Sequence, residues 1–439
     1  MIKRPLFLIF LISFTTIVSS EVVFETDAFL KGPTKVFDAF TDKNFTCAFP
    51  LIGRYNSSDL IAIWAFNTGC KAPPYTLTAT RRLINTTTLQ AVENDTFISV
   101  NITCNSNPWY TYTFNNYIGI ACTTPDASSP NISNIVVYSF PSTIQSPSEI
   151  KAAKITSNTQ ADIEYKVLQL AYYDGYFYVT YTLANTDPPL DLYLQGVSVT
   201  NSNQKRYHTP PTLQSDDTSG ISKSVCAKLL HNDTVVCAWR EDTQARVVYA
   251  TVNPSTSVVS TEVVIANDVG SYKFYPVKII VSESHYAILM KQVSNGATEK
   301  FSIHISTSQE TALLPFTLEA GYNDANLTAA GAYFDGFFTI IRSREGSNGY
   351  ALHTQESLQL YDSSGAANGN EIVLLEDGRV FQGLVLDDQS YWVLCLDTMA
   401  GNWERGYLGK VFDRISNSGN NLHLVYLLGS LLVFLTFIL

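Results

Sequence analysis

The sequence has few charged side chains and no stretch rich in basic residues. Asp, Glu, Lys and Arg make up 15% of its 439 residues, and the formal net charge is −11 at pH 7. An acidic chain without a basic stripe repels phosphate backbones, which argues against a nucleic-acid partner. The 25 Tyr and 24 Phe residues, with abundant Ser and Thr, instead suit pleated, half-buried β-sheet surfaces.

Motifs for catalysis and metal binding are also missing. The six His residues show no metal-ligand spacing, and neither a calcium loop nor the hydrolase motif Gly-x-Ser-x-Gly occurs. Glycosidases need two facing carboxylates. The acidic pairs in this chain fall in expected loops or turns and are interpreted as solvated: Asp216-Asp217, Glu241-Asp242 and Asp387-Asp388. We therefore assign no catalytic residue, metal or cofactor.

Several other side chains could bind a ligand, but each has a simpler structural interpretation. Arg81, Arg240 and Arg342 could converge on a carboxylate, as in a sialidase, yet the complete Asp-box turns of that family are absent. Aromatic residues near strand ends could stack on a sugar or anchor a partner, although packing in the core is the default for Trp109, Trp392 and Trp403.

The N-terminus has the pattern of a signal peptide. Basic Lys3 and Arg4 precede an apolar run from Leu6 to Val18, which is too short to span a bilayer. Small or medium-sized residues, Val18 to Ser20, follow this run and precede charged Glu21. We therefore expect cleavage after Ser20 and a signal peptide over residues 1–20. An uncleaved membrane anchor is the alternative.

The C-terminus has the pattern of a GPI-attachment signal. An uncharged tail over residues 424–439 follows a polar spacer over residues 414–423. Within the spacer, Asn417 is the expected lipidation site, with Ser418 next. The alternative is a single transmembrane helix, but the tail is shorter than the ~20 residues that a span needs. Both interpretations place residues 21–413 outside the cell, on the outer face of the plasma membrane.

Seven Cys residues fit an oxidising compartment. Their spacing suggests three local disulfides, Cys47 with Cys70, Cys104 with Cys122, and Cys226 with Cys237. Cys395 is then left as a buried apolar thiol. Glycosylation is expected at exposed sequons, which occur at Asn44, Asn56, Asn85, Asn94, Asn101, Asn131, Asn232 and Asn326.

An internal repeat predicts the architecture. A tight turn followed by a strongly apolar strand recurs seven times, at intervals of 51 to 59 residues. The second turn residue of each copy is residue 58, 116, 175, 233, 284, 336 or 389. Asp-Gly, Asn-Asn and Asn-Asp turns supply the positive φ that two-residue hairpin loops require.

Four short strands in each repeat predict a seven-bladed β-propeller, an all-β fold, over residues 21–413. After the last turn there is room for one more strand, Tyr407–Phe412, so the missing outer strand is expected from Glu21–Phe24. That pairing would close the ring and remove open sheet edges. The alternative is two β-sandwich domains joined by the segment from Pro141 to Pro147.

The repeats resemble the degenerate propeller-like repeats of extracellular surface proteins, in which an apolar strand, an Asp-Gly turn and an apolar strand ending in Trp follow one another. Asp174-Gly175, Asp335-Gly336 and the strand ending at Trp239 carry the likeness. The resemblance implies a surface-exposed binding or scaffold role and transfers no functional residue.

These patterns together favour a GPI-anchored surface module that binds a protein or glycan ligand, without nucleic acid. Two alternatives come from other classes. One is a diverged glycan-processing enzyme that uses the central pocket of the propeller, and the other is a structural surface-coat protein.

Overall fold

Strongly apolar segments of the described chain form the second strand of the blades. In β3 (Leu60–Asn67), β11 (Tyr176–Leu183) and β15 (Val235–Glu241), consecutive side chains are buried. Neighbouring side chains on a strand point to opposite faces, so such a strand must be covered on both sides. Each of these sheets therefore has to be packed between two others.

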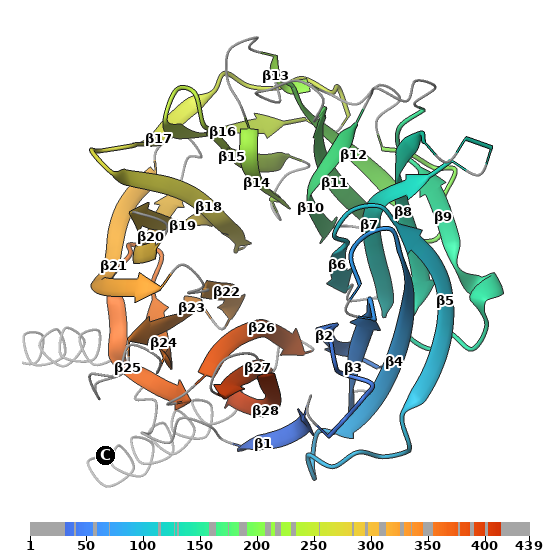
Figure 1. Ribbon diagram of the computed structural model, residues 1–439. Coiled ribbons are helices and arrows are strands. Elements are labelled where there is room, and N and C mark those ends of the chain that lie inside the picture. The colour runs from blue at the N-terminus through green and yellow to red at the C-terminus, as the bar shows by residue number, and fades with distance from the viewer. Residues whose placement is uncertain are drawn as a thin grey trace, which may run out of the picture.

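The computed structural model describes residues 31–413 apart from connecting segments at 39–40, 56–58, 70, 113–115, 127, 130, 158–163, 174, 184–190, 207–211, 216–220, 230–233, 254, 283–284, 295–296, 307–312, 325–328, 335, 346–353, 376–377, 387–389 and 400–402. Within these residues, the chain forms seven four-stranded antiparallel sheets, one for each predicted repeat. Figure 1 shows the seven sheets around one axis, as the blades of a propeller.

The first four blades follow one another along the chain. Blade 1 contains β2 (Ala48–Arg54), β3, β4 (Tyr75–Asn85) and β5 (Thr96–Cys104). Blade 2 contains β6 (Trp109–Tyr112), β7 (Tyr117–Pro125), β8 (Ser133–Pro141) and β9 (Lys151–Lys154), with a 3-10 helix at Pro147–Glu149. Blade 3 contains β10 (Tyr165–Tyr173), β11, β12 (Asp191–Ser198) and β13 (Thr212–Ser215). Blade 4 contains β14 (Ile221–Lys228), β15, β16 (Arg246–Val252) and β17 (Val263–Asn267).

Two further blades have the same order, and the last one takes a strand from the other end of the chain. Blade 5 contains β18 (Tyr272–Val281), β19 (Tyr286–Ser294), β20 (Ala297–Ser306) and β21 (Leu313–Asp324). Blade 6 contains β22 (Ala329–Phe334), β23 (Phe337–Glu345), β24 (Thr354–Tyr361) and β25 (Ala367–Leu375). Blade 7 contains β26 (Gly378–Leu386), β27 (Ser390–Met399), β28 (Trp403–Asp413) and β1 (Lys31–Asp38).

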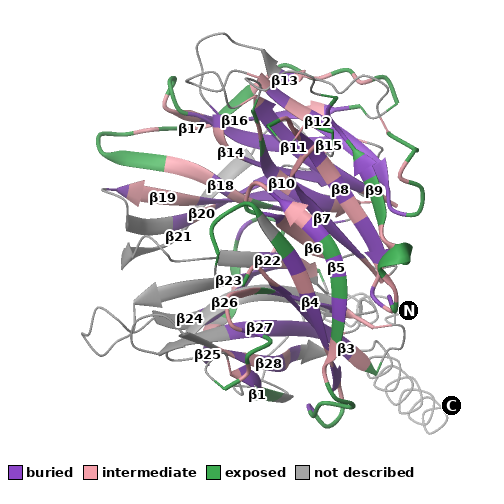
Figure 2. Ribbon diagram, turned by 45° about the vertical axis from the view of Figure 1, so that its right-hand side comes forward, coloured by how far each residue is buried: buried purple, intermediate pink, exposed green. Residues whose placement is uncertain are grey.

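The hydrophobic core is divided among the junctions between blades. Buried side chains form seven clusters, and each combines residues of two neighbouring blades. In Figure 2 the buried residues concentrate along the strands, whereas exposed residues lie mostly at connections and outer edges. The two-sandwich alternative is wrong, because β8, the 3-10 helix and β9 carry the segment from Pro141 to Pro147 within one blade.

The recurring turns join the first and second strands of the blades, as the sequence predicted. Asn116, Gly175 and Gly336, the second turn residues that the structure describes, have φ values of 61°, 77° and 92°. Positive φ is accessible to Gly and tolerated by Asn, which explains these residue types. The turns lie at one face of the ring, the hairpin face. The innermost strands begin at the opposite face, the loop face.

Ring closure uses an N-terminal strand, but not the predicted one. Strand β1 pairs with β28, while residues 21–24 lie outside the described residues. Gly32 and Pro33 interrupt the alternating pattern by which β1 could have been predicted as a strand from the sequence. Pro is tolerated here because β1 is an edge strand, whose outer side needs no ladder hydrogen bonds. Val36 and Phe37 supply the buried side chains that the closing strand contributes.

Candidate functional site: a basic and aromatic cluster at the axis

Side chains from two blades that are not neighbours meet beside the axis. Trp109 begins β6 in blade 2 and Lys223 lies on β14 in blade 4, yet the Lys223 Nζ atom is 5.2 Å from the centroid of the Trp109 ring. Trp109 Nε1 also donates a hydrogen bond of 3.1 Å to the Val167 carbonyl of β10, in blade 3. Because β10 lies between the two blades, the contact crosses its axial edge.

The positive charges of two more lysines influence the pKa of Lys223. Lys166 of β10 is exposed, and Lys291 of β19 is half-buried. Desolvation lowers the pKa of Lys223, and the charges of Lys291 and Lys166 lower it further. Desolvation also lowers the pKa of Lys291. We call Trp109, Lys166, Lys223 and Lys291 the axial cluster; it draws on blades 2, 3, 4 and 5.

Strand register explains how the lysines come together. Lys223 is paired with Arg240 across blade 4, and Lys291 with Tyr275 across blade 5, so each pair shares one face of its sheet. The Arg240 guanidinium carbon lies 4.8 Å from the centroid of the Tyr275 ring. The two faces therefore pack against each other and bring Lys223 and Lys291 to the same junction.

Two carboxylates neutralise the charge of Arg240, in contrast to the lysines of the axial cluster. Its Nε and Nη2 atoms each lie 2.7 Å from a carboxylate oxygen, of Asp242 and Asp268 respectively. Desolvation opposes its charge, but the hydrogen bonds to Asp268 and Asp242 outweigh this effect and raise its pKa. Arg240 is thus a structural cation that joins blades 4 and 5, since it also donates to the Phe274 carbonyl at 2.9 Å.

Aromatic side chains extend the cluster over blade 3. Tyr165 and Trp109 are both partly buried and pack against the same core cluster between blades 2 and 3. Tyr165 contacts Tyr181 edge-on, with ring centroids 6.1 Å apart, and Tyr181 stacks on Tyr193 at 5.3 Å. Tyr193 donates a 2.7 Å hydrogen bond to Asp191. The partly exposed rings of Trp109 and Tyr165 therefore lie at the loop-face ends of β6 and β10, and the Lys223 ammonium group lies beside the Trp109 ring.

Lys278 of β18 has a related environment. Its side chain is exposed to solvent, yet desolvation lowers its pKa. A side chain meets both conditions when it is accessible to water but surrounded by protein on most sides.

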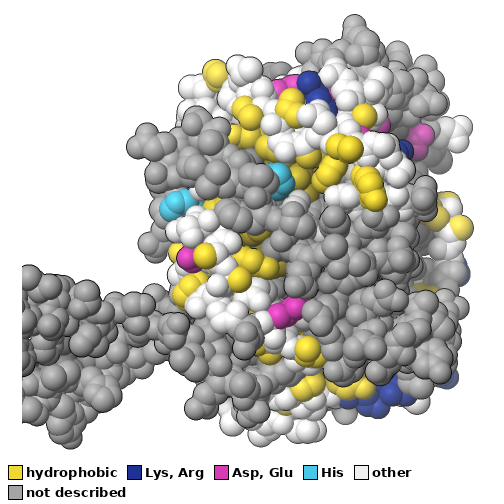
Figure 3. Space-filling model, turned by 90° about the vertical axis from the view of Figure 1, so that its left-hand side faces the viewer, with side chains coloured by type: hydrophobic (Ala, Val, Ile, Leu, Met, Phe, Trp, Pro, Cys, Tyr) yellow, Lys and Arg dark blue, Asp and Glu magenta, His cyan; other side chains and the backbone are white. Residues whose placement is uncertain are grey.

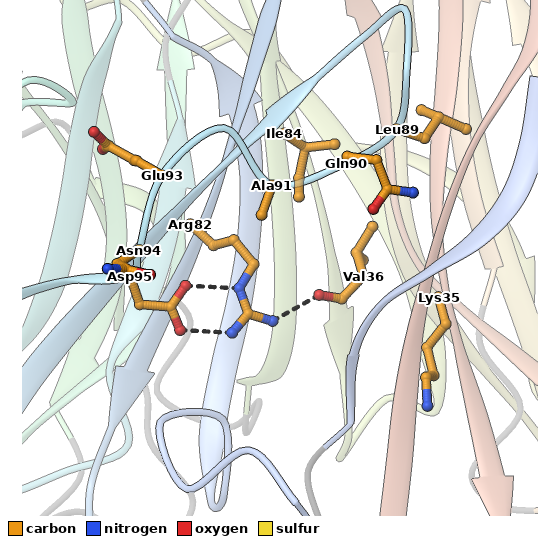
Figure 4. Close-up of a pocket in the computed structure, with 10 residues that line it drawn as sticks. All are labelled: Lys35, Val36, Arg82, Ile84, Leu89, Gln90, Ala91, Glu93, Asn94 and Asp95. Atoms are coloured by element: carbon orange, nitrogen blue, oxygen red, sulfur yellow. Dashed lines mark hydrogen bonds and ion pairs between the residues drawn. The ribbon is translucent and has the colours of Figure 1, made fainter.

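A second candidate site lies where the ring closes. A cavity of about 390 Å³ is lined by Lys35, Val36, Arg82, Ile84, Leu89, Gln90, Ala91, Glu93, Asn94 and Asp95. Figure 4 shows the Arg82 guanidinium between the Asp95 carboxylate and the Val36 carbonyl. Arg82 Nη2 also lies 2.5 Å from Asp42. Because its hydrogen-bonding groups are engaged by the protein, Arg82 fastens β1 to blade 1 and offers little to a ligand.

The arginines named from the sequence do not converge. Arg81 is buried in blade 1, where it donates 2.9 Å to the Ser142 carbonyl of blade 2 and lies over the rings of Tyr55 and Trp64. Arg240 is three blades further along the ring. The side chain of Arg342 lies outside the described part of the chain. Arg81 and Arg240 are therefore inter-blade supports, not a carboxylate-binding group.

The acidic pairs and the Trp residues have separate outcomes. The interpretation of Glu241 as a solvated loop residue is wrong, because it ends strand β15, where it is buried and paired with Arg246. Asp242 is paired with Arg240. Trp392 is buried and its Nε1 donates 2.9 Å to Ser390 Oγ, so only Trp109 of the described Trp side chains named above stands at a candidate site. Outside the described residues or side chains are Asp216, Asp217, Asp387, Asp388 and Trp403. No group of His, Cys, Asp and Glu that could hold a metal occurs among the residues that the structure describes.

Two predicted disulfides are present. Cys104–Cys122 joins blade 1 to blade 2, and Cys226–Cys237 joins paired positions of β14 and β15. Cys47 is disulfide-bonded, while its expected partner Cys70 lies outside the described residues. Cys395 is buried between blades 6 and 7, as predicted.

The other processing sites stay predictions. Asn44, Asn94, Asn101 and Asn131 are exposed and Asn85 is half-buried, so all five are accessible to some degree. Beyond the described residues lie Asn56, Asn232, Asn326, Asn417 and Ser418, the signal-peptide segment 1–20 and the tail 424–439. No helix within the described ranges is long and apolar enough to cross a membrane.

The axial lysines were missed because they are far apart in the sequence. A signal does exist in the repeat: Lys166 and Lys223 lie nine and ten residues before the second residue of their respective hairpin turns. Aligning the repeats on these turns places both lysines at the same height on the innermost strands. The contribution of Lys291, from a second strand, could not be found in this way.

Comparisons with known proteins identify the fold alone. No family model matches the chain, and no curated protein matches it. The β-propeller domain of the Trilobed protease from Pyrococcus furiosus is similar, with 12% identity, a TM-score of 0.43, and coverage of 84% of this chain and 97% of that one. The α-L-arabinanase of Penicillium chrysogenum is similar as well, with 9% identity, a TM-score of 0.41, and coverage of 89% of this chain and 98% of that one.

The NanB sialidase of Streptococcus pneumoniae is also similar, with 8% identity, a TM-score of 0.42, and coverage of 88% of this chain and 70% of that one. The Dos1 propeller is a further similar structure, with 10% identity, a TM-score of 0.44, and coverage of 86% of this chain and 95% of that one. Likenesses of this size carry no argument about activity.

Proposed function

We propose that this protein is a GPI-anchored extracellular propeller that binds a protein or glycan ligand at its axial cluster. The observation that carries the proposal is the contact between Trp109 and Lys223 across the axial edge of β10. Four blades contribute to the cluster, although packing of neighbouring blades needs no such contact. Side chains gathered from separate elements around an axis are typical of a ligand site.

The character of the cluster supports binding more than catalysis. Hydrolysis of a glycosidic bond requires two facing carboxylates, and two of the carboxylates described nearby are engaged, Asp191 by Tyr193 and Asp268 by Arg240. Aromatic and cationic groups, by contrast, provide affinity without a chemical step.

The sequence patterns of a signal peptide and a GPI-attachment signal, together with the sequons, support the proposed external location, and the two disulfides agree with an oxidising compartment. Treatment of intact cells with a phosphatidylinositol-specific phospholipase tests the anchor. We expect release of the protein with a new C-terminus at Asn417 or Ser418. Retention on the membrane with the tail still attached would contradict GPI anchoring.

Binding is tested with a secreted form that ends at Asp413 and therefore keeps all seven blades. The probes are an oligosaccharide array and intact cells. We expect Trp109→Ala to weaken binding at least tenfold. Phe97→Ala removes an exposed aromatic side chain from the outer strand of blade 1 and serves as the matched control.

Binding by Trp109→Ala at the wild-type level would move the site away from the axis. Absence of any binding by the wild-type protein would remove the binding function itself. Near-ultraviolet circular dichroism of each variant establishes that its tertiary packing is intact.

A further inference from the structure

We infer that the ligand of the axial cluster is an acidic saccharide, whose carboxylate or sulfate group is bound by Lys166, Lys223 and Lys291 while a sugar ring packs on Trp109. This inference rests on the proposed function and names the chemistry of its ligand. It comes from the charge balance of the cluster, the surroundings of Lys223 and the position of the aromatic rings.

The axial cluster carries charge of the opposite sign to that of the whole chain. Acidic residues outnumber basic ones by 39 to 28. Several described cations elsewhere have carboxylate partners: Arg82 has Asp42 and Asp95, Arg240 has Asp242 and Asp268, Arg246 has Glu241 and Glu262, and Lys154 has Asp126. Within the described chain, no carboxylate forms an ion pair with any of the three axial lysines.

The surroundings of Lys223 make an anion favourable. Its ammonium group is partly desolvated, and the nearby charges that act on it come from Lys291 and Lys166, so both influences oppose its charge. The Trp109 ring provides a cation–π contact but no neutralising charge. A bound carboxylate or sulfate would interact favourably with all three lysines in a partly dehydrated site, where electrostatic attraction is stronger than in bulk water.

The aromatic rings favour a saccharide over a simple anion. The hydrogen bond from Trp109 Nε1 to Val167 fixes the ring at the axial edge of β10. Tyr165 is the next partly exposed ring on the same core cluster. The C–H groups on the apolar face of a sugar carry partial positive charge, so they pack on the negative face of an aromatic ring. An aromatic surface beside unpaired ammonium groups thus matches both halves of an acidic sugar.

The experiment measures affinity by titration calorimetry for four probes: a sulfated oligosaccharide, a carboxylated oligosaccharide, their neutral counterpart and an oligoglutamate peptide. We expect an acidic saccharide to bind at least tenfold more tightly than the neutral one. Raising the NaCl concentration from 50 to 500 mM should weaken this binding, because salt screens the attraction. The sulfated and carboxylated arms distinguish the two sources of negative charge.

Lys223→Gln tests the assignment of the site. We expect it to weaken acidic-saccharide binding at least tenfold and to reduce the salt dependence. Lys71→Gln changes the net charge equally at an exposed position in the connection between β3 and β4, so it should bind within twofold of the wild type.

A second substitution, Lys223→Met, gives a readout that is independent of any ligand. Removing a desolvated, repelled charge should raise the thermal unfolding temperature by a few degrees. A lower unfolding temperature would contradict the interpretation that the charge of Lys223 destabilises the folded protein.

The outcomes separate this inference from the proposed function. The acidic nature of the ligand is contradicted if Lys223→Gln and Lys71→Gln lose the same affinity, or if neutral and acidic saccharides bind equally tightly. If Trp109→Ala still abolishes binding in that case, the axial site itself stands. Tighter binding of oligoglutamate than of either saccharide overturns the saccharide class, and unaltered binding by Trp109→Ala overturns the site and the inference together.

Discussion

Single buried charges and polar groups account for much of the chemistry of this propeller. Arg81, Arg82 and Arg240 each donate a hydrogen bond to a backbone carbonyl of a neighbouring blade. An Arg that reaches across a junction fixes one sheet relative to the next, because its planar guanidinium binds several oxygens in defined directions. The arginines hold the scaffold, whereas no described carboxylate forms an ion pair with the lysines of the axial cluster.

His304 makes the stability of the fold depend on pH. It is buried on β20, and desolvation lowers its pKa from 6.5 to about 4. As the pH falls below 6.5, the unfolded chain takes up the proton first, so the free energy of unfolding decreases until about pH 4. This difference corresponds to about 3 kcal/mol.

The matched variant is His304→Gln, which cannot be protonated. Urea unfolding at pH 7 and pH 4.5 should show a smaller loss of stability for the variant than for the wild type. The same pH dependence in both proteins would mean that the pKa of His304 does not differ between the folded and the unfolded state.

At the scale of elements, turn chemistry and apolar runs made the blades predictable. Both signals are local: a turn needs positive φ at one residue, and a strand covered on both faces needs an unbroken apolar run. The closing strand was not predictable in this way, because Gly32 and Pro33 interrupt the strand pattern of residues 31–38. Its assignment depends on pairing with β28, at the other end of the chain.

The two described disulfides should stabilise the fold to slightly different extents. Their sequence separations are 18 residues for Cys104–Cys122 and 11 for Cys226–Cys237. In the chain-entropy account, replacing Cys104 and Cys122 by Ala lowers the free energy of unfolding by about 3 kcal/mol, and replacing Cys226 and Cys237 lowers it by a few tenths less.

Guanidinium unfolding of the two double variants measures the difference. Because all four residues are buried, both substitutions leave similar cavities and the comparison is matched. A larger loss for the pair within blade 4 would argue against an entropic origin of the stabilisation.

At the scale of the whole molecule, closure of the ring depends on a few contacts of β1. Phe37 lies opposite Gly406 of β28 and stacks on Phe45, with ring centroids 4.3 Å apart. A Cβ atom at Gly406 would lie 2.0 Å from the Phe37 ring. Gly406 is therefore required for the close approach of β1 to β28.

Gly406→Ala should displace Phe37 and destabilise the closing strand by about 1–3 kcal/mol, as overpacking does. Hydrogen exchange should show faster exchange in β1 than in the wild type, with smaller changes in the blades opposite. Combining the variant with Phe37→Ala removes the clash, so the effects of the two substitutions should not add. Additive effects would place the strain somewhere other than this contact.

The seven-blade ring was predictable from the repeat, but the axial cluster was not. A repeat reports local structure at a fixed interval, whereas Trp109, Lys223 and Lys291 meet only once the blades are curved around a common axis. Their positions in the sequence differ by more than sixty residues at each step. The composition pointed the other way, since a chain with a net charge of −11 gives no reason to expect unpaired cations at its centre.

The placement of β28 has a mechanical consequence. It lies between β27 and β1, so the strand nearest to the proposed membrane tether is hydrogen-bonded along both edges. A pulling force transmitted from the membrane through residue 413 would load two ladders at once along the direction of the strand. Such loading is shear, in which many hydrogen bonds resist together, rather than peeling of an outer strand one bond at a time. A propeller closed in this way is built to resist tension that is applied at its C-terminal strand.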